Sequence, residues 1–536
     1  MVRSSDLRTG LSVACLLLVL AAASAAQDAA DKRDQGKLSS ALHRIAVTAE
    51  RGGSVKALGL RNVSPEGDRV KAVIELAPEA DVEGLRAQVV ALGGSVEERA
   101  GSLVRVSLPP LALRAVSRHP AVRRMREPYY PSKKDVVSEG AAVMHAPEYR
   151  SRTGADGTGV AVAILDSTFA GAQALVGSEL PAGTIATDFV SSRLAQYSEP
   201  HGTACAEIVH DVAPGATLVL AGFEDEVGWA AEIDRLVAAG VRIISHSIGF
   251  DNLFPLDGNN FFTQKVDQVA ASNVLFVTAA GNEAEKYYQG TWRDLNGNRL
   301  MEFGANDALA VGVSSTGTSV VLRWDDPFGR SSHDYDLLIV TEDFNFASPS
   351  FTGTGVLAYS ADAQRGASDP TESLQVSVPA DRVAYAVVVW DSTTPLNTSQ
   401  RFWLWASDGV DPSLATASYS LSTPGDARGA LTVGAVAFDS GAIESFSSRG
   451  PTADGRIKPD LAGPDRVTTA GYAGSPFPGT SAATPHVAGA AALILSRYPG
   501  LSAASLRAAV ERATTSGGGS KNNDVGYGLV DLNRAQ

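Results

Sequence analysis

An alternation of apolar runs and helical patterns between residues 155 and 290 constrains the fold more than any other feature. Gly159–Leu165 (GVAVAIL) is a continuous apolar run, which is typical of a parallel strand buried on both faces. The same pattern predicts strands at Thr217–Ala221, Ile243–Ser247 and Val274–Ala279, separated by helices at 201–210, 229–239 and 260–272. Strands that alternate with helices predict an α/β fold with a doubly wound parallel sheet.

This alternation stops near residue 290 and resumes after residue 430. Between residues 290 and 430, short alternating runs such as 320–324 and 384–390 are separated by Gly, Pro, Ser and Asp, and five of the six tryptophans lie in this segment or at its edge. Such a segment predicts a β-sandwich inserted into the α/β domain. After the insert, a strand at 430–436 and a small-residue helix at about 481–497 restore the α/β pattern.

The amino-terminal part of the chain predicts a smaller domain of strands and helices. Strands are expected at Val70–Leu76 and Leu103–Leu108, and helices at 81–92, with Asp81 as the N-cap, and at 110–119. Residues 27–134 hold 19 Lys/Arg and 13 Asp/Glu, whereas residues 135–536 hold 24 and 45. The opposite charges favour docking of the small domain onto the rest of the chain.

The first 26 residues have the pattern of a secretory signal. Arg3 and Arg8 precede the apolar run Leu11–Ala22, and the small residues 23–26 form a cleavage site. We therefore expect a secreted protein, extracellular or periplasmic, with no membrane span. The net charge of −14 argues against a general affinity for nucleic acid. Cleavage would leave Cys205 as the one thiol, which we expect to be a small buried residue, with a mercury-sensitive thiol as the alternative.

Three short blocks carry side chains suited to nucleophilic catalysis. Asp166 directly follows the first apolar strand, at the end where open α/β sheets build their sites. His201 begins a helix and is followed by glycine. Ser481 opens an Ala/Gly helix, whose N-terminus favours a developing negative charge. Pro485 is expected in or near the first turn of this helix, where its missing N–H costs least.

In order and spacing, these blocks resemble the Asp, His and Ser boxes of the subtilisin-like serine proteases, or subtilases. The resemblance covers about residues 135–290 and 425–536. Four further segments are similar to subtilase segments: Ser247-Ile248-Gly249, Ala279-Ala280-Gly281-Asn282, Ser447-Ser448-Arg449-Gly450-Pro451 and Lys458-Pro459-Asp460.

The resemblance implies a serine endopeptidase that cleaves protein or peptide substrates and needs no cofactor for catalysis. His201 would be the general base, Asp166 would orient its ring, and Ser481 would be the nucleophile. Asn282 would donate to the oxyanion. Substrate binding would fall to Ser247, Ile248, Gly249, Ala279, Ala280 and Gly281.

Together with the patterns at 1–26 and 291–424, the resemblance implies a zymogen with four parts. These are a signal peptide at 1–26, an inhibitory prosegment at 27–134, a catalytic domain at 135–290 and 425–536, and a β-sandwich insert at 291–424. The prosegment would act as an intramolecular inhibitor and be cut off somewhere within about 127–150.

Two positions depart from the subtilase pattern. Ser167-Thr168-Phe169 follows Asp166 where the family often has a glycine, and Gly463-Pro464-Asp465 stands where Ala-Pro-Gly is typical. Neither departure removes a catalytic group, but both are expected to reshape loops near the cleft.

Two alternatives stay open. Asp294-Leu295-Asn296-Gly297-Asn298, with Glu302, spaces oxygen atoms as calcium loops do, although such runs are also common in turns. The competing function is a catalytically weak or inactive secreted protein that binds a partner through its β-sandwich insert. Such a protein predicts loss of a triad residue or of the oxyanion donor, and all four are present.

Overall fold

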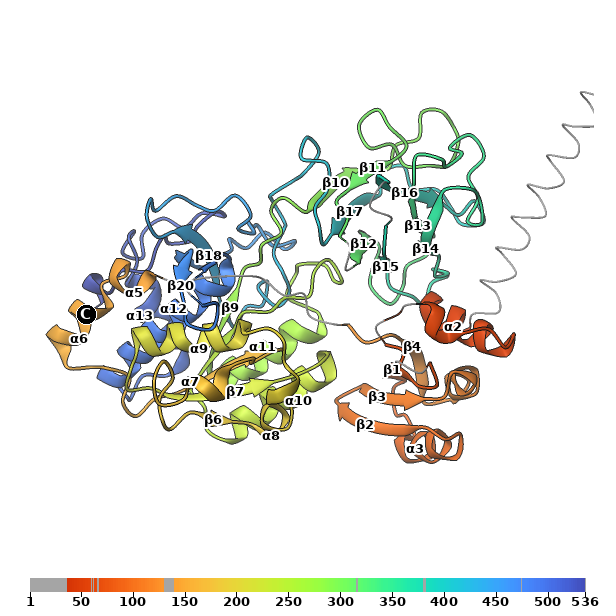
Figure 1. Ribbon diagram of the computed structural model, residues 1–536. Helices are drawn as coiled ribbons and strands as arrows, with labels where there is room; N and C mark the ends of the chain where they lie inside the picture. Colours follow the sequence, from red (N-terminus) through yellow and green to blue (C-terminus); the bar gives the residue numbers. More distant parts are fainter. Residues whose placement is uncertain are drawn as a thin grey trace, which may run out of the picture. The chain divides into compact units, whose positions relative to one another are not determined.

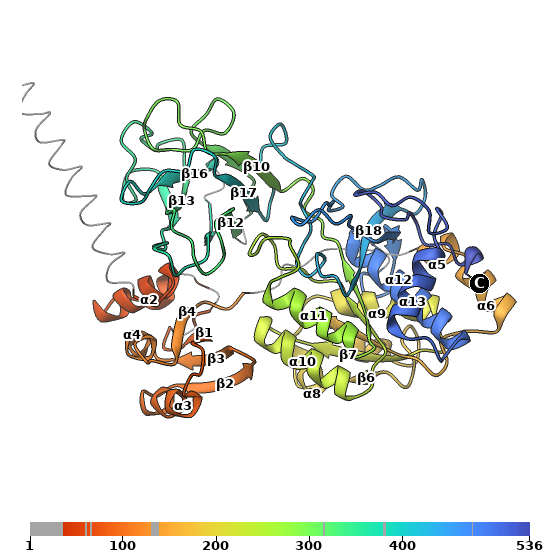
Figure 2. The same ribbon diagram turned by 180° about the vertical axis from the view of Figure 1, so that it is seen from behind.

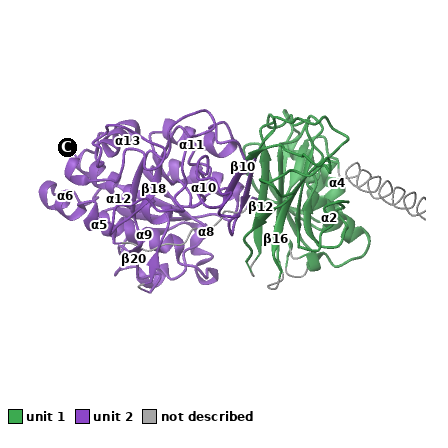
Figure 3. Cartoon of the chain, turned by 90° about the horizontal axis from the view of Figure 1, so that it is seen from above, with its two compact units in different colours: residues 1–128, 290–401 green, residues 129–289, 402–536 purple. Residues whose placement is uncertain are grey.

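The structure is a computed structural model that describes residues 36–129, 139–314, 317–378 and 382–535, except for 59, 61, 65, 66 and 474. The predicted signal peptide and part of the predicted cleavage region lie outside the described residues. The chain divides into two compact units (Figure 3). Unit 1 contains the residues up to Pro128 and Gly290–Arg401, and unit 2 contains Tyr129–Gln289 and Phe402–Gln536.

Unit 2 is built on a seven-stranded sheet with the order β19-β18-β9-β8-β5-β7-β6, in which every pair is parallel. The chain order reverses at β5, because β7 and β8 lie on its two sides. This sheet confirms the predicted doubly wound α/β fold. Its strands are β5 (Ala161–Asp166), β6 (Ile185–Ala186), β7 (Thr217–Gly222), β8 (Ile243–His246), β9 (Leu275–Ala279), β18 (Ala430–Ala437) and β19 (Leu461–Asp465).

Three of the longer helices of unit 2, α10, α11 and α13, begin at side-chain caps. Asp225 caps α10 through the Gly228 N–H at 3.0 Å, and Asn260 and Thr263 form a capping box at the start of α11. Helices α9 and α12 pack against one another, and α10 packs against α11; Figures 1 and 2 show α10 beside β7 and α12 beside β18. The longer helices are α9 (His201–Val212), α10 (Glu226–Ala238), α11 (Phe261–Ala271), α12 (Thr480–Arg497) and α13 (Ala503–Arg512), and the shorter ones are α5 (Gly140–Val143), α6 (Ala146–Thr153), α7 (Ala172–Leu175) and α8 (Asp188–Ser191).

Small residues let α12 approach its neighbours closely. A Cβ atom on Gly489 would lie 2.6 Å from the Val212 side chain, so α9 and α12 can pack at this distance only with glycine there. Val162 and Ile164 of β5 contribute to the same core. The central strand, α9 and α12 therefore form one packed body.

The amino-terminal domain of unit 1 is a four-stranded antiparallel sheet with the order β2-β3-β1-β4. Asp81 caps α3 as predicted, by accepting the Gly84 N–H at 2.9 Å. The helix expected at 110–119 is a 3₁₀ turn followed by the short α4. The elements are α2 (Ser40–Glu50), β1 (Val70–Leu76), α3 (Val82–Ala91), β2 (Ser95–Ala100), β3 (Leu103–Leu108), α4 (Leu113–Ser117) and β4 (Val122–Arg126).

The inserted segment forms two antiparallel sheets, with the orders β10-β17-β12-β15 and β11-β16-β13-β14, and confirms the predicted β-sandwich. Trp324 and Tyr335 are fully buried with their rings 5.4 Å apart, so these aromatics are core residues. The boundary between the two units falls within β10 and β17. The strands are β10 (Tyr287–Thr291), β11 (Leu309–Val311), β12 (Thr318–Trp324), β13 (Tyr335–Val340), β14 (Val356–Ser360), β15 (Thr371–Val376), β16 (Ala384–Trp390) and β17 (Arg401–Ala406).

Among the described residues, none of the helices has the length and the apolar character that crossing a membrane requires.

Candidate active site

Asp166 ends β5, the strand at which the chain order of the sheet reverses. Its side chain is fully buried. One carboxylate oxygen, Oδ1, accepts the N–H groups of Ser167 at 2.8 Å and Thr168 at 3.3 Å, and the other, Oδ2, lies 2.7 Å from Nδ1 of His201. The backbone of the following turn thus holds the carboxylate with one oxygen directed at the histidine.

His201 is the first residue of α9 and is also fully buried. The next residue explains how the helix can begin so close to β5. A Cβ atom on Gly202 would lie 2.7 Å from the Asp166 Cβ and 2.6 Å from the Thr168 carbonyl oxygen. Glycine is therefore required for the approach that brings the histidine ring to the carboxylate.

Ser481 is the second residue of α12, and its side chain exchanges hydrogen bonds with Ser247. The Ser481 hydroxyl donates to the Ser247 carbonyl at 3.0 Å, and the Ser247 hydroxyl donates to the Ser481 carbonyl at 3.0 Å. Ser247 directly follows β8, the strand that neighbours β5. The serine therefore lies at the same edge of the sheet as Asp166.

Pro485, which was predicted in or near the first turn of α12, is the sixth residue of this helix. An N–H at this position would bond to the carbonyl of Ser481, four residues earlier. Because proline lacks that N–H, the Ser481 carbonyl stays open to other donors. It accepts the Ser247 hydroxyl at 3.0 Å and the Cys205 thiol at 3.6 Å, so the proline allows side chains of two other elements to bind the start of the helix.

Cys205 is buried, in agreement with the prediction. The nearest nitrogen, oxygen and sulfur atoms of Asp166, His201 and Cys205 all lie within 4.8 Å of one another, the one such group of potential metal ligands among the described residues. Burial raises the pKa of the Cys205 thiol well above its usual value. The thiol donates to the Ser481 carbonyl at 3.6 Å and Nδ1 of His201 faces Asp166, so hydrogen bonds at the start of the two helices account for this grouping.

Asn282 is bound to the residue before Ser481. Its Oδ1 accepts both the N–H of Thr480 at 2.9 Å and the Thr480 hydroxyl at 2.8 Å. With Oδ1 used in this way, the NH₂ group of the amide faces away from Thr480 as a donor. The N–H of Ser481 belongs to the first turn of α12, where the helix itself supplies no acceptor. These two donors have the chemistry needed to bind an oxyanion.

The residues expected to bind substrate lie at the carboxyl ends of two neighbouring strands. Ser247 and the two residues after it follow β8, and Ala279 ends β9. Gly281 donates its N–H to the Thr480 hydroxyl at 3.2 Å, which connects this segment to the start of α12. Ser247, Ile248, Gly249, Ala279, Ala280 and Gly281 are all buried.

Two acidic residues that hold the site together were not assigned a role from the sequence. Asp465, where the subtilase pattern has glycine, accepts the Gly479 N–H at 2.7 Å and so binds the residue before α12. Glu207 of α9 accepts the N–H groups of Ala470 at 2.6 Å and Gly471 at 2.9 Å. Burial raises the pKa of both carboxyl groups to about 7. The departure at Asp465 was the one signal available in the sequence.

The loop considered for calcium is closed by its own hydrogen bonds. Asp294 accepts the N–H groups of Gly297 at 2.7 Å and Arg299 at 3.0 Å, and Glu302 accepts the Leu295 N–H at 2.8 Å. These bonds account for the Asp/Asn spacing as a turn. Calcium binding there stays a prediction.

Comparison with known proteins agrees with this geometry. The model of the Subtilase family matches residues 157–321 and 391–528. The chain belongs to the subtilase family. It is 32% identical over 137 residues to the serine protease AprX of Bacillus subtilis (strain 168), a match that covers 21% of this chain and 31% of that relative. The chain thus spans about a third of the length of this curated relative.

Among solved structures, this subtilase resembles the CspB protease of Clostridium perfringens. The match has a TM-score of 0.51 and 17% sequence identity, and it covers 74% of this chain and 98% of that chain. At this identity the likeness concerns the fold, and it agrees with a parallel sheet that carries additional antiparallel sheets.

Proposed function

We propose that this subtilase is a secreted serine endopeptidase, made as a zymogen, that hydrolyses peptide bonds through Asp166, His201 and Ser481. The observation that carries the proposal is the 2.7 Å contact between Asp166 Oδ2 and His201 Nδ1, at the sheet edge where Ser481 begins α12. Membership of the subtilase family supports the same chemistry.

In the proposed mechanism, the hydroxyl of Ser481 leaves the Ser247 carbonyl and gives its proton to Nε2 of His201 as Oγ attacks the scissile carbonyl carbon. Nδ1–H of His201 donates to Asp166, which keeps the ring in the required tautomer and stabilises its positive charge. The proton then passes to the leaving amine, which departs and leaves an acyl group on Ser481. Water, deprotonated by His201, hydrolyses this ester and restores the serine.

The oxyanion formed in both steps would be bound by the Nδ2 group of Asn282 and the N–H of Ser481. In subtilisin, another member of the family, removing one such donor costs about 3–4 kcal/mol of transition-state stabilisation, and we expect a similar magnitude for this chain. Thr480 supports this role, because its hydrogen bonds to Oδ1 orient the Asn282 amide.

Secretion and maturation are supported by the sequence patterns at 1–26 and by the basic amino-terminal domain. In the proposal, this domain is the prosegment and is separated from unit 2 by a cut within about 127–150.

Fluorophosphonate labelling of the purified protein, combined with intact mass, tests the proposal. We expect one label on the parent protein and none on Ser481→Ala, which should also keep its amino-terminal domain. Ser496→Ala, near the other end of the same helix, is the matched control and should label normally. A parent protein that stays unlabelled after trypsin has removed its amino-terminal domain would contradict the proposal.

A further inference from the structure

Unit 1 joins two segments that are far apart in the sequence. The amino-terminal domain ends at Pro128, and the inserted segment begins at Gly290, yet both belong to one compact unit (Figure 3). The amino-terminal domain therefore packs with the β-sandwich insert within one unit.

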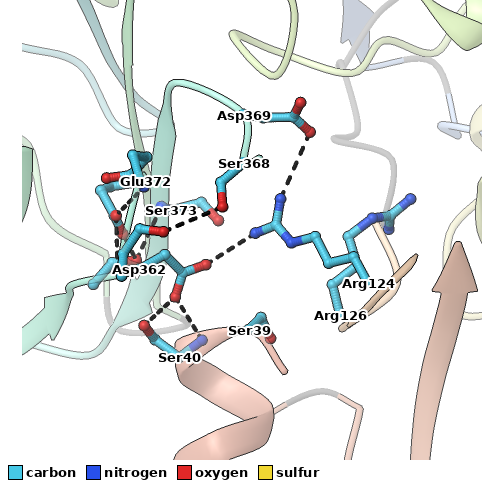
Figure 4. Close-up of polar contacts among 12 residues, drawn as sticks. Ser39, Ser40, Arg124, Arg126, Asp362, Ser368, Asp369, Glu372 and Ser373 are labelled. Atoms are coloured by element: carbon cyan, nitrogen blue, oxygen red, sulfur yellow. Dashed lines mark hydrogen bonds and ion pairs between the residues drawn. The ribbon is translucent and has the colours of Figure 1, made fainter. Parts of the chain in front are cut away.

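The centre of this interface is Asp362, in the connection between β14 and β15 of the insert (Figure 4). Its Oδ1 accepts the N–H of Ser40 at 2.6 Å and also the Ser40 hydroxyl, and its Oδ2 pairs with Nη2 of Arg124 at 2.9 Å. Ser40 is the first residue of α2, where the helix dipole favours a carboxylate. Both oxygens of Asp362 are thus bound by the amino-terminal domain.

A second acidic residue of the insert extends the contact. Oδ2 of Asp369 lies 3.6 Å from Nη1 of Arg124, so this one guanidinium faces two carboxylates. The three side chains are less than a quarter exposed, which protects the ion pairs from screening. Further along α2, the Arg44 guanidinium lies 5.9 Å from the ring centre of Tyr359 in β14.

The insert holds its acidic residues in place with hydrogen bonds of its own. The N–H of Asp362 donates to Oε1 of the buried Glu372 at 2.8 Å, and Gln364 Nε2 donates to the same oxygen at 2.9 Å. Oδ1 of Asp369 accepts the Gly329 N–H at 2.7 Å. The insert's own hydrogen bonds therefore hold the backbone at Asp362 and the carboxylate of Asp369, which lowers the entropic cost of the contact.

The basic residues of β4 have different partners. Arg123 and Arg126 both pair with Glu75 of β1, inside the amino-terminal domain. Arg124, between them, pairs with Asp362 and Asp369 of the insert. Arg124 therefore carries positive charge from the amino-terminal domain to the acidic residues of the insert.

We propose that the insert is the docking surface for the chain's own amino-terminal domain, and that the contacts of Asp362 keep this domain bound after the linker is cut. The insert then sets how long the cut domain stays on the protein. The consequence for inhibition rests on the proposed zymogen function; the docking itself does not.

The test uses the full chain with Ser481→Ala and a recognition site for a sequence-specific protease placed within 130–138. This enzyme cuts the linker whether or not the chain is itself a protease. Release of the amino-terminal fragment is followed by native mass spectrometry. We expect the parent fragment to stay bound, and Asp362→Asn and Arg124→Gln each to release it at least about tenfold faster, since each removes one charge of a shielded pair.

Asp343→Asn is the matched control, because Asp343 is also an aspartate of the insert but pairs with Arg382 of the same insert. Its release rate should equal that of the parent. Release of the parent fragment at once, or equal rates for Asp362→Asn, Arg124→Gln and Asp343→Asn, would overturn the proposal. If circular dichroism shows that Asp362→Asn does not fold, the release rate of Arg124→Gln, on the other side of the contact, tests the proposal instead.

Fluorophosphonate labelling of the chain with Ser481 intact separates the two proposals. A chain that stays unlabelled even after trypsin has removed its amino-terminal domain contradicts the proposed catalysis and leaves the release rates as evidence on docking. A chain that labels, but whose variants release the fragment at the parent rate, contradicts docking alone. If both proposals hold, self-cut Asp362→Asn should reach full activity about ten times sooner than Asp343→Asn.

Discussion

Each unit contains an aspartate hydrogen-bonded to Nδ1 of a histidine, and the Asp166–His201 pair of unit 2 differs from the Asp326–His333 pair of unit 1 in its surroundings far more than in its geometry. In unit 2, Asp166 Oδ2 lies 2.7 Å from His201 Nδ1, and in unit 1, Asp326 Oδ1 lies 2.8 Å from His333 Nδ1. The first pair is fully buried, whereas 23% of the His333 side chain is exposed.

Asp326 closes a turn between two strands of the insert. Its Oδ2 accepts the Ser331 hydroxyl at 2.9 Å and the N–H groups of Ser332 and His333 at 3.1 Å. Burial by itself raises the pKa of Asp326, but the hydrogen bonds from His333 and Ser331 lower it overall. Under the proposed function, the difference is that a nucleophile and oxyanion donors at the start of α12 act together with the Asp166–His201 pair, whereas the Asp326–His333 pair closes a turn.

The largest expected effect comes from comparing two single variants, Asp166→Asn and Asp326→Asn. Asp166→Asn should lower kcat on a peptide substrate by roughly 10⁴-fold, because an amide no longer holds His201 in the tautomer that accepts the serine proton. Asp326→Asn should leave kcat unchanged. Similar losses of kcat in the two variants would mean that the Asp166 pair, like the other, is structural.

The next largest effect is expected at Asn282, the proposed oxyanion donor beside the Asp166–His201 pair, which has no counterpart in the proposal for the Asp326–His333 pair. Asn282→Asp keeps an oxygen that can accept from Thr480 but removes the Nδ2 donor. We expect kcat to fall by about 10²–10³-fold with KM little changed, because the donor acts on the transition state. Steady-state kinetics measure both constants; a variant with normal kcat would show that Asn282 serves only to hold Thr480.

A buried histidine bonded to an indole and a hydroxyl provides a further contrast with the two Asp–His pairs. His246 accepts the Trp229 indole N–H at 3.0 Å, and its Nδ1 lies 3.1 Å from the Thr278 hydroxyl. Burial lowers the pKa of His246 from 6.5 to about 3. In the unfolded chain this ring binds a proton near pH 6.5, but in the folded chain only near pH 3, so stability falls as the pH falls through this window.

Between pH 6.5 and 4.5 this one group should cost about 2–3 kcal/mol of unfolding free energy. His246→Gln should therefore reduce the pH dependence of urea unfolding by about one proton. Some decrease in stability toward low pH should remain in this variant, because burial also lowers the pKa of His486, to about 4. Thr278→Val is the control: it removes a contact of the ring but not the ring, so the slope should persist. If the pH dependence of the unfolding free energy were the same in His246→Gln as in the parent, His246 would not be the group responsible for it.

A smaller effect, on the free energy of unfolding, is expected when the Asp326–His333 pair of unit 1 is broken. Asp326→Asn removes charge-assisted hydrogen bonds from a turn and should lower the unfolding free energy by about 1–2 kcal/mol. Chemical denaturation measures this loss. His333→Asn should lose less, because the bonds of Asp326 to Ser331 and to the backbone persist.

Much of the framework could be predicted because local patterns report burial. The strands Val70–Leu76 and Leu103–Leu108 agree with the structure to the residue, and α3 begins at the predicted cap. Strand β2 (Ser95–Ala100) escaped prediction, since its residues are mostly polar and exposed or half-buried. A strand with little apolar surface leaves no clear period-2 pattern to read.

Local sequence was enough to predict the order of elements and to select Asp166, His201, Ser481 and Asn282 as candidates, because periodicity and short motifs are local properties of a chain. Which side chains meet became visible in the folded chain. The Asp166–His201 contact joins two elements, Ser247 binds Ser481 across 234 positions, and Arg124 pairs with Asp362 of the insert. Which residues form these contacts depends on the tertiary packing of the helices and strands. Contacts between residues that are distant in the sequence produce no local periodicity, so they cannot be predicted from the sequence pattern.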